Sequence, residues 1–103
     1  MNLIEIGRRI KAERKRRNIS QEKLAEMINV SPHYIYEIER GMKSMSLETL
    51  INLATATKLS TDYILFGNHN NDAATLSEQL NEMTEEQRSK AEDAFKALLP
   101  YLK

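Results

Sequence analysis

The feature that most restricts the fold of this sequence is a three-residue turn, Asn29 to Ser31, between two short segments of helical periodicity. Ser20 is a good N-cap for the first segment, whose apolar face is formed by Leu24, Ala25 and Ile28. Ser31 can cap the second segment, Pro32 suits its first turn, and Gly41 can end it. Two helices joined by so short a turn cross closely, and the small side chain of Ala25 permits this approach.

The flanking segments are also helical in pattern. A helix over residues 3 to about 16 is predicted from three apolar residues at helical spacing, Leu3, Ile6 and Ile10. Ser46 can cap a fourth helix, which has an apolar stripe formed by Leu47, Leu50, Ile51 and Ala54.

A short fifth helix is predicted just before Gly67, which can end it. Thr61 is the expected cap of this helix, and Tyr63 and Phe66 are expected to be core residues. No segment alternates in the way that a half-buried strand requires. The chain is therefore expected to be all-α, with a five-helix domain over residues 1–67.

Residues 68–74 are polar and rich in asparagine, so they are expected to form a linker. Residues 75–103 are predicted to form a C-terminal helical extension, in which Thr84 and Gln87 make a capping box and Pro100 ends or kinks the last helix. The apolar stripe of the extension consists of Leu76, Leu80, Met83, Ala91, Ala94, Phe95, Leu98 and Leu102. This stripe needs burial, either against its own domain or against a second copy, and the second arrangement would make a homodimer.

Charge is unevenly distributed although the formal net charge is zero. Residues 1–67 contain 11 Lys/Arg and 8 Asp/Glu, whereas residues 68–103 contain 4 Lys/Arg and 7 Asp/Glu. The basic excess near the N-terminus is the kind of field that attracts a polyanion such as nucleic acid. Six basic residues could form a phosphate-binding edge or simply a solvated helix face: Arg8, Arg9, Lys11, Lys15, Arg16 and Arg17.

Several kinds of chemistry are not expected. The absence of cysteine excludes disulfides, thiolate metal sites and thiol catalysis. No metal site is expected from two histidines, His33 and His69, of which the second lies on the linker. No catalytic set or glycine-rich phosphate loop is present, so neither an enzyme nor a cofactor is predicted. With no apolar run near the ~18 residues of a membrane span and no secretory signal, a cytoplasmic location is the default expectation.

Three motifs follow one another at spacings typical of a known family: SQEKLAE, ERG and SLETL. On these motifs, residues 3–67 resemble the lambda-repressor-like (Cro/repressor type) helix–turn–helix family. The resemblance implies a five-helix domain that binds operator DNA, usually as a dimer on a pseudo-palindrome.

The same resemblance assigns roles to individual residues. The second helix of the pair would lie in a major groove, with base contacts from Ser31, Pro32, His33, Tyr36 and Glu37. Phosphate contacts would come from Gln21, Arg40, Lys43 and Ser44. Arg14 and Glu39 match a pair that usually forms an internal salt bridge.

Tyr36 and Glu37 depart from the common family pattern, which often has serine at the first position and a basic or amide residue at the second. A carboxylate near phosphates is repelled unless it accepts a hydrogen bond from cytosine N4.

The function predicted from the sequence is a sequence-specific DNA-binding transcriptional regulator, a repressor that binds a pseudo-palindromic operator in double-stranded DNA as a homodimer. Activation is equally compatible with these residues. The alternative is a protein-interaction module, an antitoxin-like or antagonist-binding regulator whose C-terminal helices capture a partner protein.

Overall fold

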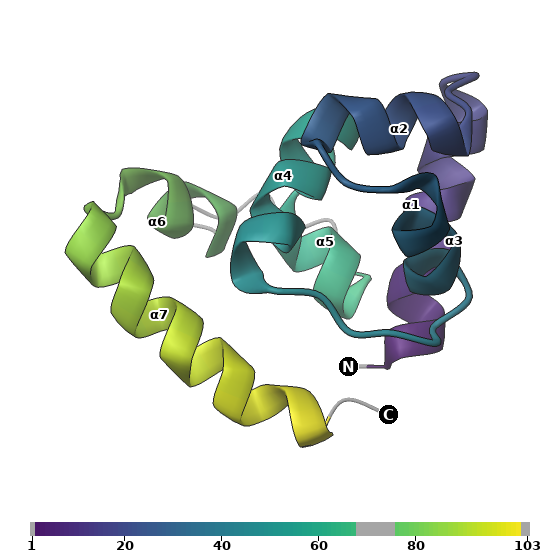
Figure 1. The fold of residues 1–103 in the computed structure, drawn as a ribbon. Helices are drawn as coiled ribbons and strands as arrows, with labels where there is room; N and C mark the ends of the chain where they lie inside the picture. The colour runs from purple at the N-terminus through teal and green to yellow at the C-terminus, as the bar shows by residue number, and fades with distance from the viewer. Residues whose placement is uncertain (1, 68–75, 102–103) are drawn as a thin grey trace.

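The computed structural model describes residues 2–67 and 76–101, and within these residues the regular structure is entirely helical, as expected. The elements are α1 (Leu3–Arg16), α2 (Gln21–Ile28), α3 (Pro32–Glu39), α4 (Leu47–Thr57), α5 (Thr61–Phe66), α6 (Leu76–Glu82), α7 (Glu85–Leu98) and the 3-10 turn η1 (Leu99–Tyr101). Helices α1 to α5 pack together, and α6 and α7 form a hairpin beside α4 and α5 (Figure 1). The expected linker, residues 68–74, and Leu102 of the apolar stripe lie outside the described residues.

The helix starts follow the predicted caps with one exception. Ser20, Ser31 and Ser46 each accept the backbone N–H of the third residue of the helix that they open, and Thr84 with Gln87 forms the capping box. The prediction that Thr61 caps α5 is wrong, because the hydroxyl of Ser60 accepts the N–H of Tyr63 at 3.0 Å. Thr61 is instead the first residue of the helix and is buried.

The turn between α2 and α3 consists of the three predicted residues, 29 to 31. Asn29 adopts the left-handed conformation, with φ 58° and ψ 49°, and thereby ends α2. The N–H of Val30 donates to the carbonyl of Ala25 at 2.9 Å, which closes the end of the helix. Ser31 then opens α3, whose buried residues Ile35 and Ile38 anchor it on the core.

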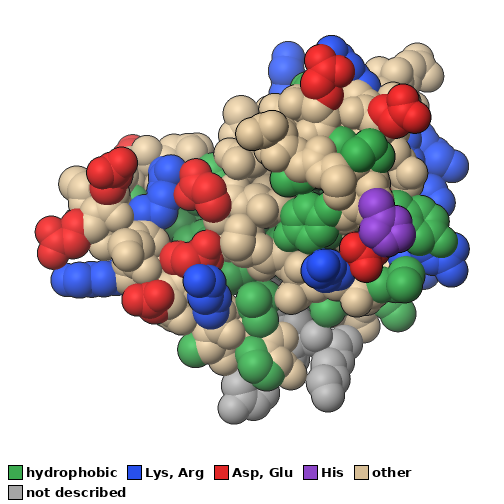
Figure 2. Space-filling view, viewed as in Figure 1, with side chains coloured by type: hydrophobic (Ala, Val, Ile, Leu, Met, Phe, Trp, Pro, Cys, Tyr) green, Lys and Arg blue, Asp and Glu red, His purple; other side chains and the backbone are tan. Residues whose placement is uncertain are grey.

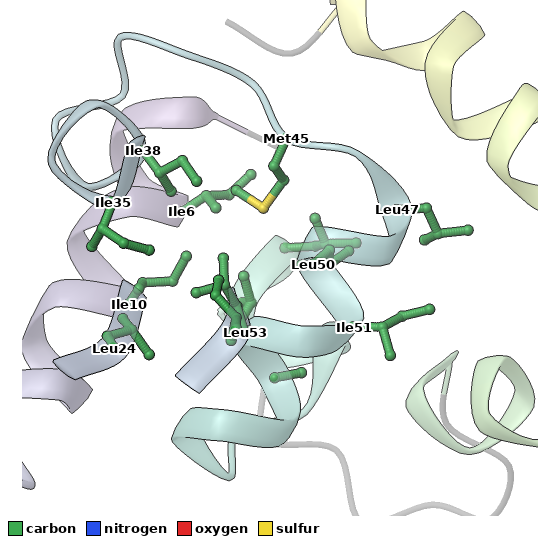
Figure 3. Packing of buried hydrophobic residues seen from close by; sticks show 14 of the residues in the cluster. Ile6, Ile10, Leu24, Ile35, Ile38, Met45, Leu47, Leu50, Ile51 and Leu53 are labelled. Carbon is green, nitrogen blue, oxygen red and sulfur yellow. The ribbon is translucent and has the colours of Figure 1, made fainter. Parts of the chain in front are cut away.

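The core is formed by aliphatic side chains from all five N-terminal helices (Figure 3). Its fully buried members are Ile6, Ile10, Leu24, Ile35, Ile38, Leu50, Leu53 and Ile64. Burial of each such side chain stabilises the fold by about 1.5–3 kcal/mol relative to leaving it exposed. Leu47 and Ile51 point away from this centre, towards α7 and α6 (Figure 3).

Gly7 allows α1 and α3 to approach each other closely. A Cβ atom at this position would lie 2.3 Å from the carbonyl oxygen of Ile38 and 2.6 Å from that of Glu39. Both atoms belong to the backbone at the end of α3, so any larger residue would push that end away from α1.

The C-terminal hairpin packs on its own chain. Leu80 is buried against the core, and Met83, Ala91 and Phe95 are partly buried there. Two polar contacts add to this packing. The carboxylate of Glu92 accepts the N–H of Leu47 at 2.8 Å, and Arg88 lies 3.7 Å from Glu48.

Burial of the C-terminal stripe is incomplete. An apolar hollow of about 260 Å³ lies between the hairpin and helices α4 and α5. Phe66 and Leu98 line it and are 49% and 51% exposed. The expectation that Phe66 is a core residue is therefore wrong, because α5 ends at this residue with its side chain on the open side of the hollow. No helix in the described part of the chain has both the length and the apolar character needed to cross a membrane.

Candidate nucleic-acid interface

The outer face of α3 carries the side chains that the sequence places in a major groove. Because Ile35 and Ile38 face the core, Pro32, His33 and Tyr36 are exposed, as is the cap Ser31. The rings of His33 and Tyr36 stack with their centroids 6.0 Å apart, and the guanidinium of Arg40 lies 5.5 Å from the Tyr36 ring centre. These contacts restrict the positions of His33, Tyr36 and Arg40, whose exposed side chains do not pack against the core.

Glu37 lies on the same face and is the least exposed of the five predicted base-contacting residues. One of its carboxylate oxygens lies 3.8 Å from Nε2 of His33 and 3.9 Å from Nζ of Lys43. The exposed imidazole of His33 and the exposed ammonium of Lys43 therefore flank the carboxylate of Glu37.

The predicted phosphate-contacting residues lie at the ends of α3 and α2. Arg40 and Lys43 are exposed in the loop after α3, and Ser44 is partly buried there. The ammonium of Lys43 lies 5.7 Å from the ring centre of Tyr34. Tyr34, for which the sequence leaves phosphate contact and packing open, is partly buried against the core and supports Lys43.

Gln21, the fourth predicted phosphate contact, is the first residue of α2. Its side-chain amide donates to a carboxylate oxygen of Glu39 at 3.0 Å. The backbone N–H groups at this end of α2 are the part of the site that a phosphate would meet at the positive end of the helix dipole.

The predicted salt bridge between Arg14 and Glu39 is confirmed. Two hydrogen bonds of 2.6 and 3.0 Å join the guanidinium to the carboxylate, and both residues are buried. Since Gln21 binds the same carboxylate, this network fixes the end of α3 relative to α1 and α2.

The basic residues of α1 are largely engaged within the protein. Arg8 pairs with Glu5 at 2.9 Å, and Arg9 donates to the carbonyl of Ile64 at 3.0 Å. Arg16 and Arg17 both bind Glu13, at 2.6 and 2.7 Å. The hydrogen bond from Arg16, followed by the weaker one from Arg17, lowers the pKa of the Glu13 carboxyl from 4.5 to about 2. Four of the six candidate phosphate contacts in residues 8–17 thus have partners in their own chain, which favours a solvated helix face over a phosphate-binding edge.

The acidic residues of the C-terminal hairpin are kept apart from the α3 face. In Figure 2 red carboxylates and blue side chains lie together on the side of α6 and α7, while blue side chains line the opposite edge near α1. His33 is an exposed residue of α3. The acidic excess of the hairpin therefore lies away from the outer face of α3.

A five-helix core, a tight turn after α2 and an α3 whose outer face is exposed together define a helix–turn–helix DNA-binding domain. The family model described as helix-turn-helix, HTH_3, matches residues 10–64. The chain belongs to this family of Cro/C1-type, lambda-repressor-like transcriptional regulators, which are DNA-binding proteins and not enzymes.

Two curated proteins and one solved structure illustrate this relationship. The chain is 42% identical over 60 residues to the immunity repressor protein of Bacillus phage phi105, which covers 58% of this chain and 42% of that protein. It is 27% identical over 86 residues to the HTH-type transcriptional regulator ImmR of Bacillus subtilis strain 168, covering 81% and 68%. The P22 c2 repressor in complex with synthetic operator 9T has a TM-score of 0.60 and 38% identity, covering 61% of this chain and 96% of that one. The chain thus spans less than half the length of the phi105 repressor.

Proposed function

We propose that this protein is a sequence-specific transcriptional repressor that binds a pseudo-palindromic operator as a homodimer. The observation that carries the proposal is the outer face of α3, where Tyr36 contacts both His33 and Arg40 and all three side chains are open to solvent. The similar P22 c2 repressor was solved in complex with a synthetic operator, which supports operator binding by this chain.

The two groups of side chains have different tasks in this proposal. Base edges are contacted by Ser31, Pro32, His33, Tyr36 and Glu37, with Pro32 offering only apolar contact, for example to a thymine methyl group. Phosphates are contacted by Gln21, Arg40, Lys43 and Ser44, which set the position of α3 in the groove. Occupation of a promoter by the dimer represses transcription by excluding polymerase. The role requires access to DNA, for which a cytoplasmic location is expected.

Selection of bound duplexes from a randomised library with the full-length protein tests DNA recognition. The expected result is a two-fold symmetric consensus whose affinity falls steeply as salt is raised, because phosphate contacts release counterions. Substitution His33→Ala should change the preferred sequence, whereas Gln21→Ala should weaken binding to all sequences about equally. Absence of any enriched sequence at low salt would overturn the proposal.

The C-terminal hairpin is the proposed dimer surface. Leu98 and Phe66 leave apolar area exposed around the hollow, and a second copy would cover it. Pairing also brings together two domains that each read one half-site, which roughly doubles the contact free energy before the cost of association.

Substitution Leu98→Asp tests this surface, with Ala97→Asp as a control on the exposed part of the same helix. Sedimentation should show a dimer for the wild type and for Ala97→Asp, but a monomer with weaker operator binding for Leu98→Asp. The same apolar surface also suits the second candidate, capture of a partner protein. That candidate is favoured if the wild type is monomeric, binds its operator as a monomer, and loses a co-purifying protein on Leu98→Asp.

A further inference from the structure

Two carboxylates of α3, only two residues apart, lie in opposite environments. The Glu39 side chain is 1% exposed and bound to Arg14, so it is part of the internal network. The Glu37 side chain is 23% exposed and lies near two side chains that are themselves open to solvent, His33 at 76% and Lys43 at 57%. Glu37 is therefore an outward-facing carboxylate on the face proposed to enter the groove.

The helical spacing of residues 33, 36, 37 and 40 puts them on one side of α3. His33 precedes Glu37 by one turn, and Lys43 reaches the same carboxylate oxygen from the following loop. At 3.8 and 3.9 Å both contacts are longer than a hydrogen bond. They restrict the position of the carboxylate, and the Lys43 ammonium offsets its charge, while no hydrogen-bond donor among the described residues is bound to it.

From this arrangement we infer that Glu37 specifies a cytosine in each half-site of the operator. The inference rests on the proposed function and names one base of the recognised sequence. Its physical basis is that an ionised carboxylate accepts hydrogen bonds and donates none.

Only two bases offer donors in the major groove, cytosine through N4 and adenine through N6. Adenine carries the acceptor N7 beside its donor, and this lone pair repels the second carboxylate oxygen. Guanine presents two acceptors, and thymine presents an acceptor and a methyl group. Cytosine alone offers a donor without a neighbouring acceptor on the same base edge.

The ammonium of Lys43 reduces the electrostatic repulsion between the Glu37 carboxylate and the DNA phosphates. Phosphates repel Glu37, but Lys43, in the loop proposed to contact the DNA backbone, places its ammonium 3.9 Å from the Glu37 carboxylate. Its ammonium can attract a phosphate and remain close to Glu37, so the net charge brought into the groove is small. Glu37 then contributes to the choice of base more than to affinity.

The test compares duplexes selected by the wild type, Glu37→Gln and Glu37→Ala, each as the full chain. Glu86→Gln is the matched control, because Glu86 on α7 is 83% exposed and also lies 3.8 Å from a lysine, Lys90. The wild type and the control should select cytosine at one position of each half-site, with about tenfold weaker binding when that base pair is changed, within the range for a good base contact. Glu37→Gln should shift that position to adenine, since an amide pairs with N6 and N7, and Glu37→Ala should remove the preference there.

Other outcomes overturn the inference in distinguishable ways. If the wild type selects a clear operator and Glu37→Gln selects the same one, Glu37 does not read a base, while the proposed function stands. The same holds if no position of the wild-type operator requires cytosine. If no duplex is selected by any of the proteins, the proposed function fails and the inference fails with it. An unchanged unfolding midpoint for each variant confirms that the fold is intact.

Discussion

Arg14 of α1 and Glu39 at the end of α3 form a buried, bidentate ion pair, with Nε to Oε2 at 2.6 Å and Nη2 to Oε1 at 3.0 Å. The third nitrogen group of Arg14 donates to the carbonyl of Ile19 at 2.8 Å, and Gln21 donates to Glu39 at 3.0 Å. Three helices therefore meet at one pair of charges, on the inner side of the surface proposed to bind DNA.

Removal of one partner should be costly because it leaves the other charge buried without compensation. We expect Arg14→Met to lower the free energy of unfolding by about 3 kcal/mol, measured by urea denaturation. The double variant Arg14→Met with Glu39→Met removes both charges and should recover a large part of this loss. If the double variant lost as much stability as Arg14→Met and Glu39→Met lose together, the two residues would not be directly coupled.

For Gly7→Ala, helix propensity and steric packing predict opposite effects on the stability of the protein. Helix propensity favours alanine by about 1 kcal/mol, but the added Cβ would lie 2.3 Å from the Ile38 carbonyl oxygen. We expect the steric effect to dominate and to destabilise the protein by about 2 kcal/mol, measured by thermal unfolding. Ala12→Gly, at an exposed site of the same helix, should cost only the propensity difference of about 1 kcal/mol. A more stable Gly7→Ala protein would show that α3 can move away from α1 without loss.

Local signals in the sequence predict the helices well because caps and periodicity act over a few residues. The bounds of α1 and α2 agree with the prediction, as does the capping box at Thr84. The prediction of the α5 cap is wrong because Ser60 and Thr61 are adjacent and either residue type can cap a helix. Which of them does so depends on the core, which buries Thr61 and leaves Ser60 at the helix start.

Contacts between distant residues were harder to predict. The resemblance to a known family supplied the Arg14–Glu39 pair, and periodicity alone would not have done so. Neither indicated that Glu92 would cap α4 or that Gln21 would bind Glu39, because each contact depends on how helices cross. Nothing in the sequence indicated the role of Gly7, because that role is to lack a side chain where the backbones of α1 and α3 approach each other. The half-exposed Phe66 was missed because an apolar residue in a helix predicts burial and does not show which part of the surface stays open.

The pH dependence of stability should include a contribution from Glu13. Its pKa is lowered to about 2 in the folded protein by Arg16 and Arg17, from the ordinary value of 4.5. For a carboxyl with a depressed pKa, the stabilisation is fully present above the unfolded pKa and is lost as the pH falls through the folded pKa. The free energy difference between the wild type and Glu13→Gln should therefore shrink between about pH 5 and pH 2. Urea denaturation at a series of pH values measures it, and a constant difference would show that the pair contributes nothing.

Glu92→Ala should loosen the C-terminal hairpin without unfolding the DNA-binding domain. The carboxylate of Glu92 accepts the N–H of Leu47 at 2.8 Å, one of the N–H groups at the start of α4 that have no partner within the helix. Loss of this hydrogen bond should cost about 1 kcal/mol. Since the described side chains of α7 are at most partly buried, this is enough to speed hydrogen exchange of the α7 amides about fivefold, while those of α1 to α3 keep their protection.

Two further variants separate this contact from a general effect of charge. Asp93→Ala removes one negative charge from the exposed neighbouring position and should leave exchange in α7 unchanged. Glu92→Gln keeps an acceptor oxygen and should restore most of the protection, because the Leu47 N–H then retains a partner. Equal acceleration in Glu92→Ala and Asp93→Ala would mean that the charge of α7, and not the hydrogen bond to α4, holds the hairpin on the domain.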